Sequence, residues 1–540
     1  MAVDVVGVIV LVVFYVIVLV TGIVAGRCFK APGASETELS MVAGRKLGLG
    51  VGILTMSATY IGGGFLNGLA EGMALGGVAW TIPPLGIMCG LFLSSFLFGG
   101  PMRKKEYLTF LDPFNAKYGR EATACLFVAT LLADIFWSAA ILSALGTSLS
   151  VIIELDKVVS IVISAAIAVF YTMVGQMVAV AYTDIVELAL LVVGMGIAIP
   201  FAATNEHVNL SEAQDKWLGN IKPIQIGAWI DFFVLTSLGA IPWQSTFQRF
   251  LSAKSVRGAK IIGIVGGIIT FILGIFPLTI GAIGVSTDWN STKYERDPIA
   301  TGDASLLLPL VMYHLTPRPV AIIGLCSVAA AVMSSVDSAL LGSASMFSHN
   351  IYRAIIRKKA SEKELLWVQR GAIFIIGVLA SITAIFGDSI YGLVNFGTDI
   401  TLVTVFPQLV CSMYIEVSNG YGALIGSSLA LVLRIGGGES LMNLAPFIPY
   451  PPYGFEEQLF PVRIFSIIVA ILTTVLISEL TKLLFEKGVF PRKLDVLNQF
   501  SGVNSYSMND EEMKVNKEKE NVEIQSAYIT SDNLGYNKDL

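Results

Sequence analysis

The sequence predicts an all-α membrane protein with thirteen transmembrane helices, and three observations support this fold class. Of its 540 residues, 54% are hydrophobic and only 14% are charged, whereas a soluble protein carries about 25% charged residues. The apolar residues form long runs, and about 20 consecutive apolar residues are enough to cross a bilayer. These runs fill the chain almost without interruption to about residue 485. We therefore expect one membrane domain rather than several soluble domains.

Each apolar run is assigned to one predicted membrane segment. We expect residues 1–485 to form the membrane domain and residues 486–540, which are polar and charged, to form a largely disordered cytoplasmic tail. The thirteen predicted segments, in chain order, are 4–26, 47–72, 77–100, 123–149, 158–175, 179–201, 228–250, 259–285, 317–347, 370–387, 391–415, 420–436 and 463–484.

The distribution of basic residues predicts the orientation of these segments. The first segment lacks Lys and Arg and follows Asp4, which is unlike a cleaved signal peptide, so its N-terminus is predicted outside. The alternate loops then carry most of the Lys and Arg residues, as cytoplasmic loops do. The C-terminus is therefore predicted inside. Two glycosylation sequons, at Asn209 and Asn290, fall in loops predicted outside.

Several functional classes lack support in the sequence. No basic patch with interleaved aromatic residues indicates nucleic-acid binding. The five cysteines and three histidines are scattered, so they indicate neither a zinc site nor a disulfide framework. No nucleophile–base pair or cofactor loop indicates an enzyme, and no catalytic residue is predicted. The expected partners are the lipid bilayer and a small solute, and nothing indicates the oligomeric state.

Two predicted segments contain residues that break helices. The second segment carries Gly62–Gly64 at its middle, and the seventh carries Gly239 and Pro242. Proline removes a backbone donor inside a helix, and paired broken helices in corresponding halves of a membrane protein point to a transport site. This spacing predicts two inverted five-helix repeats, at about 47–201 and 228–415. In the alternative interpretation, the glycines only allow close helix packing.

A cluster of hydroxyl groups lies in the ninth segment. Ser334, Ser338 and Ser345 recur at near-helical spacing, and Asp337 lies among them. Sodium is a hard cation that prefers oxygen ligands, which hydroxyls and carbonyls of a broken helix provide. Asp337 is a possible further ligand. In the alternative interpretation, these small residues ease packing and their hydroxyls bond the preceding turn.

Three aromatic residues lie near the predicted helix breaks. Tyr60 precedes the glycine run, Trp243 follows Pro242, and Trp137 lies in the fourth segment. A quaternary ammonium has no hydrogen-bond donor, so proteins hold it against aromatic ring faces. The three rings predict a site for such a cation. Alternatively, they are ordinary packing or interfacial aromatics.

Nine short segments of the sequence are distinctive. They start at Leu54 (LTMSATYIGGG), Thr109 (TFLDPF), Phe136 (FWSAAILSALG), Val180 (VAYTD), Gly239 (GAIPWQ), Gly281 (GAIGVSTDWN), Ala329 (AAAVMSSVDS), Leu433 (LRIGGGE) and Pro491 (PRKLDV). In these segments the chain resembles the sodium:solute symporters and, within that family, the branch of high-affinity choline transporters. The resemblance covers roughly residues 1–497.

This resemblance implies a LeuT-type core and specific site residues. It implies that sodium binds where the second and ninth segments cross. It also implies that transport depends on chloride, for which no site is assigned. Its choline cage corresponds to Trp137, Trp243 and Tyr60, where Tyr60 replaces a tryptophan. Two further aromatic positions of the family hold Ile87 and Val394 in this sequence. The implied sodium ligands are Ala58, Ile61, Ala331, Ser334 and Ser335.

The sequence therefore predicts a sodium-coupled, chloride-dependent importer of choline in the plasma membrane, working by alternating access. Two alternatives stay open. The first, indicated by Ile87 and Val394, is a sodium symporter for another small organic solute. The second is a solute sensor that uses the same scaffold without transport.

Overall fold

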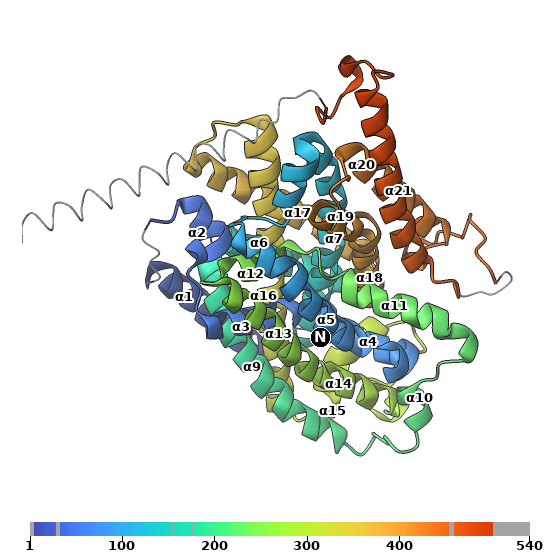
Figure 1. Ribbon diagram of the computed structural model, residues 1–540. Helices are drawn as coiled ribbons and strands as arrows, with labels where there is room; N and C mark the ends of the chain where they lie inside the picture. Colours follow the sequence, from blue (N-terminus) through green and yellow to red (C-terminus); the bar gives the residue numbers. More distant parts are fainter. Residues whose placement is uncertain (1–4, 29–32, 154, 175–176, 453–457, 501–540) are drawn as a thin grey trace, which may run out of the picture. The chain divides into compact units, whose positions relative to one another are not determined.

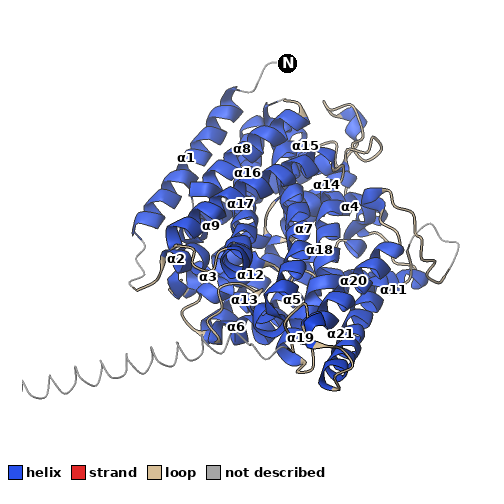
Figure 2. Ribbon diagram, turned by 90° about the horizontal axis from the view of Figure 1, so that it is seen from above, coloured by secondary structure: helices blue, strands red, loops and turns tan. Residues whose placement is uncertain are grey.

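The computed structural model describes residues 5–28, 33–153, 155–174, 177–452 and 458–500. Within these residues the chain forms helices and loops, and Figure 2 shows no strand. The all-α prediction is therefore confirmed for the described part of the chain. The predicted tail, residues 486–540, lies largely outside it. The chain divides into two compact units, 1–478 and 479–540, and every contact discussed below lies within the first.

Twenty-one α-helices are described along the chain. Their bounds are α1 Val5–Cys28, α2 Glu36–Val42, α3 Leu49–Tyr60, α4 Gly63–Trp80, α5 Pro83–Ser94, α6 Gly100–Lys104, α7 Asp112–Ile153, α8 Lys157–Val174, α9 Met177–Ala203, α10 Gln214–Leu218, α11 Ile226–Leu238, α12 Gln244–Ser252, α13 Val256–Leu273, α14 Ile275–Val285, α15 Leu307–Leu315, α16 Arg318–Met346, α17 Glu362–Phe386, α18 Ile390–Ile400, α19 Phe406–Tyr414, α20 Gly420–Gly436 and α21 Val462–Glu486.

The helices are long and apolar enough for a multi-pass membrane protein. Among the described residues, ten helices meet this criterion, and the bent pair α3–α4 makes eleven. Helices α8 and α20 coincide with two further predicted segments but are shorter apolar helices. Helical structure is required in lipid because each backbone polar group must find a partner within the chain. The total of thirteen transmembrane helices stays a prediction.

Both predicted helix breaks are present, which confirms the interpretation of the glycine and proline clusters as interruptions. Helices α3 and α4 meet at a 47° bend between Tyr60 and Gly63. Only Ile61 and Gly62 lie outside helical geometry, so the interruption is shorter than the glycine run. Helix α11 ends at Leu238, and α12 begins only after Trp243, which is extended.

Helix α16 forms the centre of the molecule. It is buried along nearly its whole length and packs against α7, α9, α12 and α3 (Figure 1). Its sequence is rich in Ala, Ser and Gly, and such small residues allow neighbouring helices to approach closely. Gly194 of α9 illustrates this, because a Cβ at that position would lie 2.1 Å from the Ser327 hydroxyl. This close packing places the hydroxyl cluster of α16 beside both broken helices.

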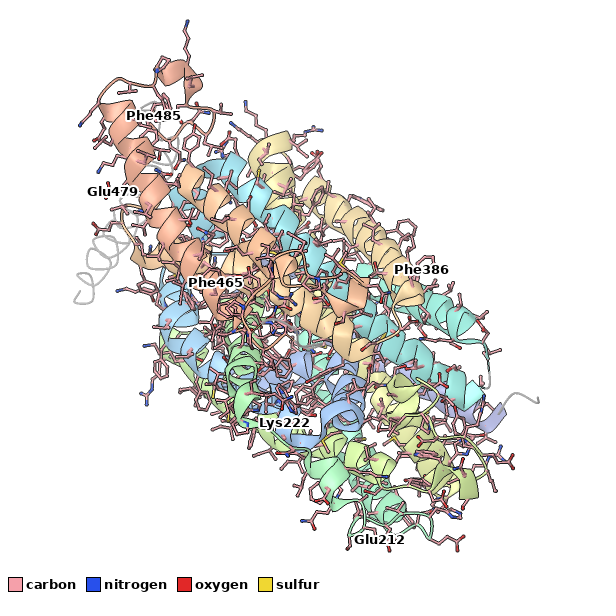
Figure 3. All side chains as sticks on the ribbon, turned by 90° about the vertical axis from the view of Figure 1, so that its right-hand side faces the viewer. Glu212, Lys222, Phe386, Phe465, Glu479 and Phe485 are labelled. Carbon is pink, nitrogen blue, oxygen red and sulfur yellow. The ribbon has the colours of Figure 1, made fainter. Side chains whose placement is uncertain are left out.

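The two predicted glycosylation loops lie against each other. Val208 pairs with Thr287, and the Asn209 amide donates to the Ser286 carbonyl at 2.9 Å. Asn209 and Asn290 are both exposed. Figure 3 labels Glu212 and Lys222 on the connection from α9 to α11, which carries the first sequon. The two sequons therefore lie on the same side of the molecule. Glycosylation itself stays a prediction.

Candidate functional site

A cavity of about 110 Å³ lies between the two broken helices. A single water needs only roughly 10–15 Å³, so the cavity has room for a small organic solute. Residues from both breaks line it, including Gly62 and Ala240. A largely apolar pocket with a few polar groups is the usual form of a small-molecule site.

The three aromatic residues predicted for substrate binding all line this cavity. The Trp243 ring lies edge-on to Tyr60, at 5.3 Å between ring centroids, and edge-on to Trp137, at 5.2 Å. Because these residues come from α3, α7 and the α11–α12 break, only tertiary packing brings them together. The structure therefore assembles the predicted cluster of rings, although its role in binding stays a prediction.

Hydrogen bonds fix the orientation of two of these rings. The Tyr60 hydroxyl lies 2.6 Å from the Thr246 hydroxyl and 3.1 Å from the Ala240 carbonyl oxygen. It thus joins the first broken helix to the second. The Trp137 indole N–H donates to the Thr398 hydroxyl at 3.0 Å and to the Val394 carbonyl at 3.1 Å. The ring faces are therefore held in place before any solute binds.

Helix α18 contributes a face that the sequence reasoning missed, except at Val394. Tyr391, Val394, Asn395 and Thr398 all line the cavity. Val394 and Asn395 each lie three or four residues from both Tyr391 and Thr398, and this spacing is the signal that could have identified one helix face. Ile87 also lines the cavity, so Ile87 and Val394, where the resemblance implied rings, form an aliphatic part of its wall. No carboxylate lines the cavity among the described residues.

Two of the predicted sodium ligands, Ser335 and Ala58, meet at the first helix break. The Ser335 hydroxyl lies 3.2 Å from the Thr59 carbonyl oxygen and 3.5 Å from that of Ala58. Ala331 lies one turn before Ser335 on the same face of α16, and Ile61 is the non-helical residue that ends α3. The packing is tight, because a Cβ on Gly62 would lie 1.9 Å from the Ser335 hydroxyl.

The carboxylate beside this cluster is Asp184 of α9. The Ser334 hydroxyl donates to Asp184 at 2.5 Å, Thr55 also donates to it, and Arg249 of α12 contacts it at 3.1 Å. Asp184 and Arg249 are fully buried. The sequence analysis did not assign Asp184 to the site, and nothing in the local sequence pairs it with Arg249.

Asp337, the possible further sodium ligand, has a different partner. It accepts a hydrogen bond from Thr172 of α8 at 2.5 Å, while its second carboxylate oxygen is buried without a partner among the described residues. Ser338 and Ser345 likewise have partners outside the sodium cluster, namely Arg249 and Gln369. A direct role of Asp337 in binding sodium stays a prediction.

The fold and the site define a multi-pass membrane protein with a solute-sized cavity between two broken helices. Residues 41–429 match the Sodium:solute symporter family. The chain belongs to this family, which confirms the family predicted from the sequence.

Relatives and solved structures agree with this assignment. The chain is 42% identical to the high-affinity choline transporter 1 of Drosophila melanogaster, over 91% of this chain and 81% of that protein. It is also 42% identical to the human high affinity choline transporter 1, over 92% of this chain and 89% of that one. A Na⁺-coupled sialic acid symporter has a similar fold, with a TM-score of 0.70 and 17% identity over 88% of this chain and 98% of that chain.

Proposed function

We propose that this protein imports choline by coupling it to sodium. The observation that carries this proposal is the group of three rings, Tyr60, Trp137 and Trp243, around a cavity that no carboxylate lines within the described part of the chain. Ring faces attract a quaternary ammonium, and the attraction reaches about 2 kcal/mol when the cation is desolvated. The names of the relatives, which are high-affinity choline transporters at about 40% identity over most of the chain, support the same substrate.

Sodium is proposed to bind where α16 crosses the α3–α4 break. Its ligands would be the carbonyls of Ala58, Ile61 and Ala331 and the hydroxyls of Ser334 and Ser335. This donor set consists of oxygen atoms, as a hard cation requires. Sodium bound there would hold α16 against the broken helix, and thereby couple the ion to the shape of the adjacent solute cavity.

We further propose a LeuT-type core of two inverted five-helix repeats, at 47–201 and 228–415, within thirteen transmembrane helices. Alternating access around the central cavity would move the solute inward, with the N-terminus outside the plasma membrane and the C-terminus inside. Membrane potential contributes about 2.3 kcal/mol per charge per 100 mV to inward movement of cations. Chloride dependence belongs to this proposal, without an assigned site.

A second candidate function is sodium-coupled transport of another small organic solute. The observation that favours it is the aliphatic wall formed by Ile87 and Val394. With fewer rings the cavity has less affinity for a quaternary ammonium, and its hydroxyl and amide groups would suit a neutral or zwitterionic solute.

Uptake of radiolabelled choline into cells expressing the chain tests the proposal. We expect saturable uptake that is lost when potassium replaces sodium and reduced when gluconate replaces chloride. Competition by unlabelled solutes in the same assay identifies another cargo. Choline-evoked current without accumulation would instead indicate a sensor, and sodium-independent uptake would refute the coupling.

A further inference from the structure

A second cavity, of about 300 Å³, lies away from the solute site at the turn between α12 and α13. Two kinds of side chain line it. Lys254 and Arg257 are basic and exposed, while Leu49 and Ile261 form an apolar wall. Leu49 is 44% exposed, so this wall is open to the surroundings. The cavity therefore combines an anion-attracting side with a lipid-compatible side.

The basic side chains of this cavity lack acidic partners among the described residues. No ion pair involves Lys254 or Arg257, and Glu38 of the neighbouring α2 already pairs with Arg45. A further cation lies nearby, because Arg103 of α6 donates to the Ala253 carbonyl at 2.7 Å. The cavity therefore has an excess of positive charge.

The distribution of basic residues places this turn on the cytoplasmic side of the membrane. The cytoplasmic leaflet is rich in anionic lipids, and basic pockets between membrane helices on this side bind their headgroups. A headgroup phosphate matches Lys254 and Arg257, and an acyl chain matches Leu49 and Ile261. A soluble anion would match only the first pair.

We propose that this cavity binds the phosphate headgroup of an acidic phospholipid of the cytoplasmic leaflet. Lys254 and Arg257 contact the phosphate, and the lipid chain lies along Leu49 and Ile261. This site is separate from the solute cavity and from the sodium ligands.

The position of the cavity gives such a lipid a mechanical consequence. The Leu47 amide, just before α3, donates to the Ser252 carbonyl at the end of α12 at 3.0 Å. Gly52 of α3 packs against Ile262 of α13 so closely that a Cβ would lie 2.5 Å from that side chain. Figures 1 and 2 show α3, α12 and α13 as neighbours. A headgroup bound here would stabilise the contact between α3, which ends at Tyr60, and α12, which begins after Trp243.

Binding of fluorescent phosphatidic acid to the purified full-length protein in a phosphatidylcholine background tests the proposal. Each basic residue near an anionic surface adds about 1 kcal/mol, or about fivefold in affinity. Lys254→Gln with Arg257→Gln should therefore weaken binding about thirtyfold. The exchange Lys254→Arg with Arg257→Lys keeps both charges and should change affinity less than threefold.

The matched control removes two charges from another exposed basic loop on the same predicted side, with Lys358→Gln and Lys359→Gln. It should change affinity less than twofold. Equal weakening by both double variants would overturn the proposal, because it would show diffuse attraction without a site. Absence of saturable binding to the unaltered protein would also overturn it. Displacement by inorganic phosphate at concentrations similar to those of phosphatidic acid would overturn the assignment to a lipid.

Discussion

Rings from α3, α7 and the α11–α12 break line the central cavity, and we propose that they hold the solute cation. Trp243 is the middle member, because it contacts both Tyr60 and Trp137. Its position after Pro242 is set by the break between α11 and α12, while the other two rings are held by hydrogen bonds to neighbouring helices. The affinity for a cation should therefore depend on Trp243 more than on any residue at the rim.

Trp243→Leu should raise the KM for choline uptake about 2- to 30-fold. Leucine keeps apolar volume but removes the ring, so the change isolates a cation–π interaction of about 0.5–2 kcal/mol. The measurement is the concentration dependence of sodium-driven uptake, corrected for surface expression. Trp367→Leu is the control, because Trp367 lies on α17 with 68% of its surface exposed. An unchanged KM in Trp243→Leu would remove this ring from the site.

Ile87→Tyr should lower the KM for choline by a similar factor. The side chain lines the cavity, so a tyrosine there adds a ring beside Tyr60, Trp137 and Trp243. Ile87→Leu keeps the aliphatic character and should leave the KM unchanged. If Ile87→Tyr weakened choline uptake while Ile87→Leu did not, the cavity would be built for a solute other than a quaternary ammonium.

At the residue scale, the sequence predicted those site residues whose type is unusual inside an apolar membrane segment. A tryptophan next to a proline inside an apolar segment, and serines at helical spacing, stand out in lipid. The partnership of Asp184 with Arg249 could not be predicted in the same way, because 65 residues separate them. Only the packing of α9 and α12 against α16 and α3 brings the two side chains together. Tyr391 was missed because an aromatic residue in an apolar segment is common.

At the scale of elements, Gly62 in the α3–α4 break packs so closely against Ser335 of α16 that no side chain fits between them. Gly62→Ala would place a Cβ 1.9 Å from the Ser335 hydroxyl and 2.3 Å from its Cβ, so α16 must shift away from the carbonyls of α3. We expect the sodium concentration for half-maximal uptake to rise at least tenfold, or uptake to be lost with the protein still at the surface.

Gly50→Ala is the matched control for this substitution. Gly50 lies in α3, the helix that ends just before Gly62, and a Cβ there meets no atom within 4 Å. It should leave both the sodium dependence and the expression unchanged. Normal sodium dependence in Gly62→Ala would show that the break and α16 do not form the ion site.

The buried pair Asp184–Arg249 joins α3, α9, α12 and α16 through Thr55, Ser334 and Ser338. Removing one member of a fully buried pair leaves an uncompensated charge and costs about 3–5 kcal/mol. Asp184→Asn should therefore lower the melting temperature of the purified protein markedly or prevent surface expression.

Replacing both members by apolar residues, Asp184→Leu with Arg249→Met, removes both charges together. Such replacements of buried pairs are often neutral for stability, so the double variant should recover most of the stability lost in Asp184→Asn. If the single variant were as stable as the unaltered protein, the pair would not hold these helices together.

A second ionic network joins α11, α18, α20 and α21, which the sequence predicts only as separate membrane segments. Arg463 of α21 contacts Asp231 of α11 at 3.2 Å and Asp399 of α18 at 2.6 Å, and Arg434 of α20 contacts Asp399 at 2.6 Å. Hydropathy placed each of these helices correctly to within a few residues. It could not show which acidic group in one helix neutralises which arginine in another, because that depends on tertiary packing.

At the scale of the whole molecule, the sequence predicts the sidedness of the loops and the structure adds a constraint. The positive-inside rule assigns each loop to one side of the membrane from its own charge. Because each loop is assigned separately, one loop can be assigned to the wrong side while another is assigned correctly. Hydrogen bonds join residues 207–209 to residues 286–288, so these two loops must lie on the same side. Asn209 and Asn290 must therefore face the same compartment.

Because the two sequons face the same compartment, we expect both Asn209 and Asn290 to be glycosylated. Asn209→Gln and Asn290→Gln should each remove one glycan in cells, seen as one step of increased gel mobility, and the double variant should migrate like glycosidase-treated protein. Lys359→Asn supplies the control, because it completes a sequon with Ala360 and Ser361 in a loop predicted inside. It should add no glycan. A glycan at residue 359, with none at Asn209 or Asn290, would invert the predicted orientation, and with it the direction in which the sodium gradient drives the solute.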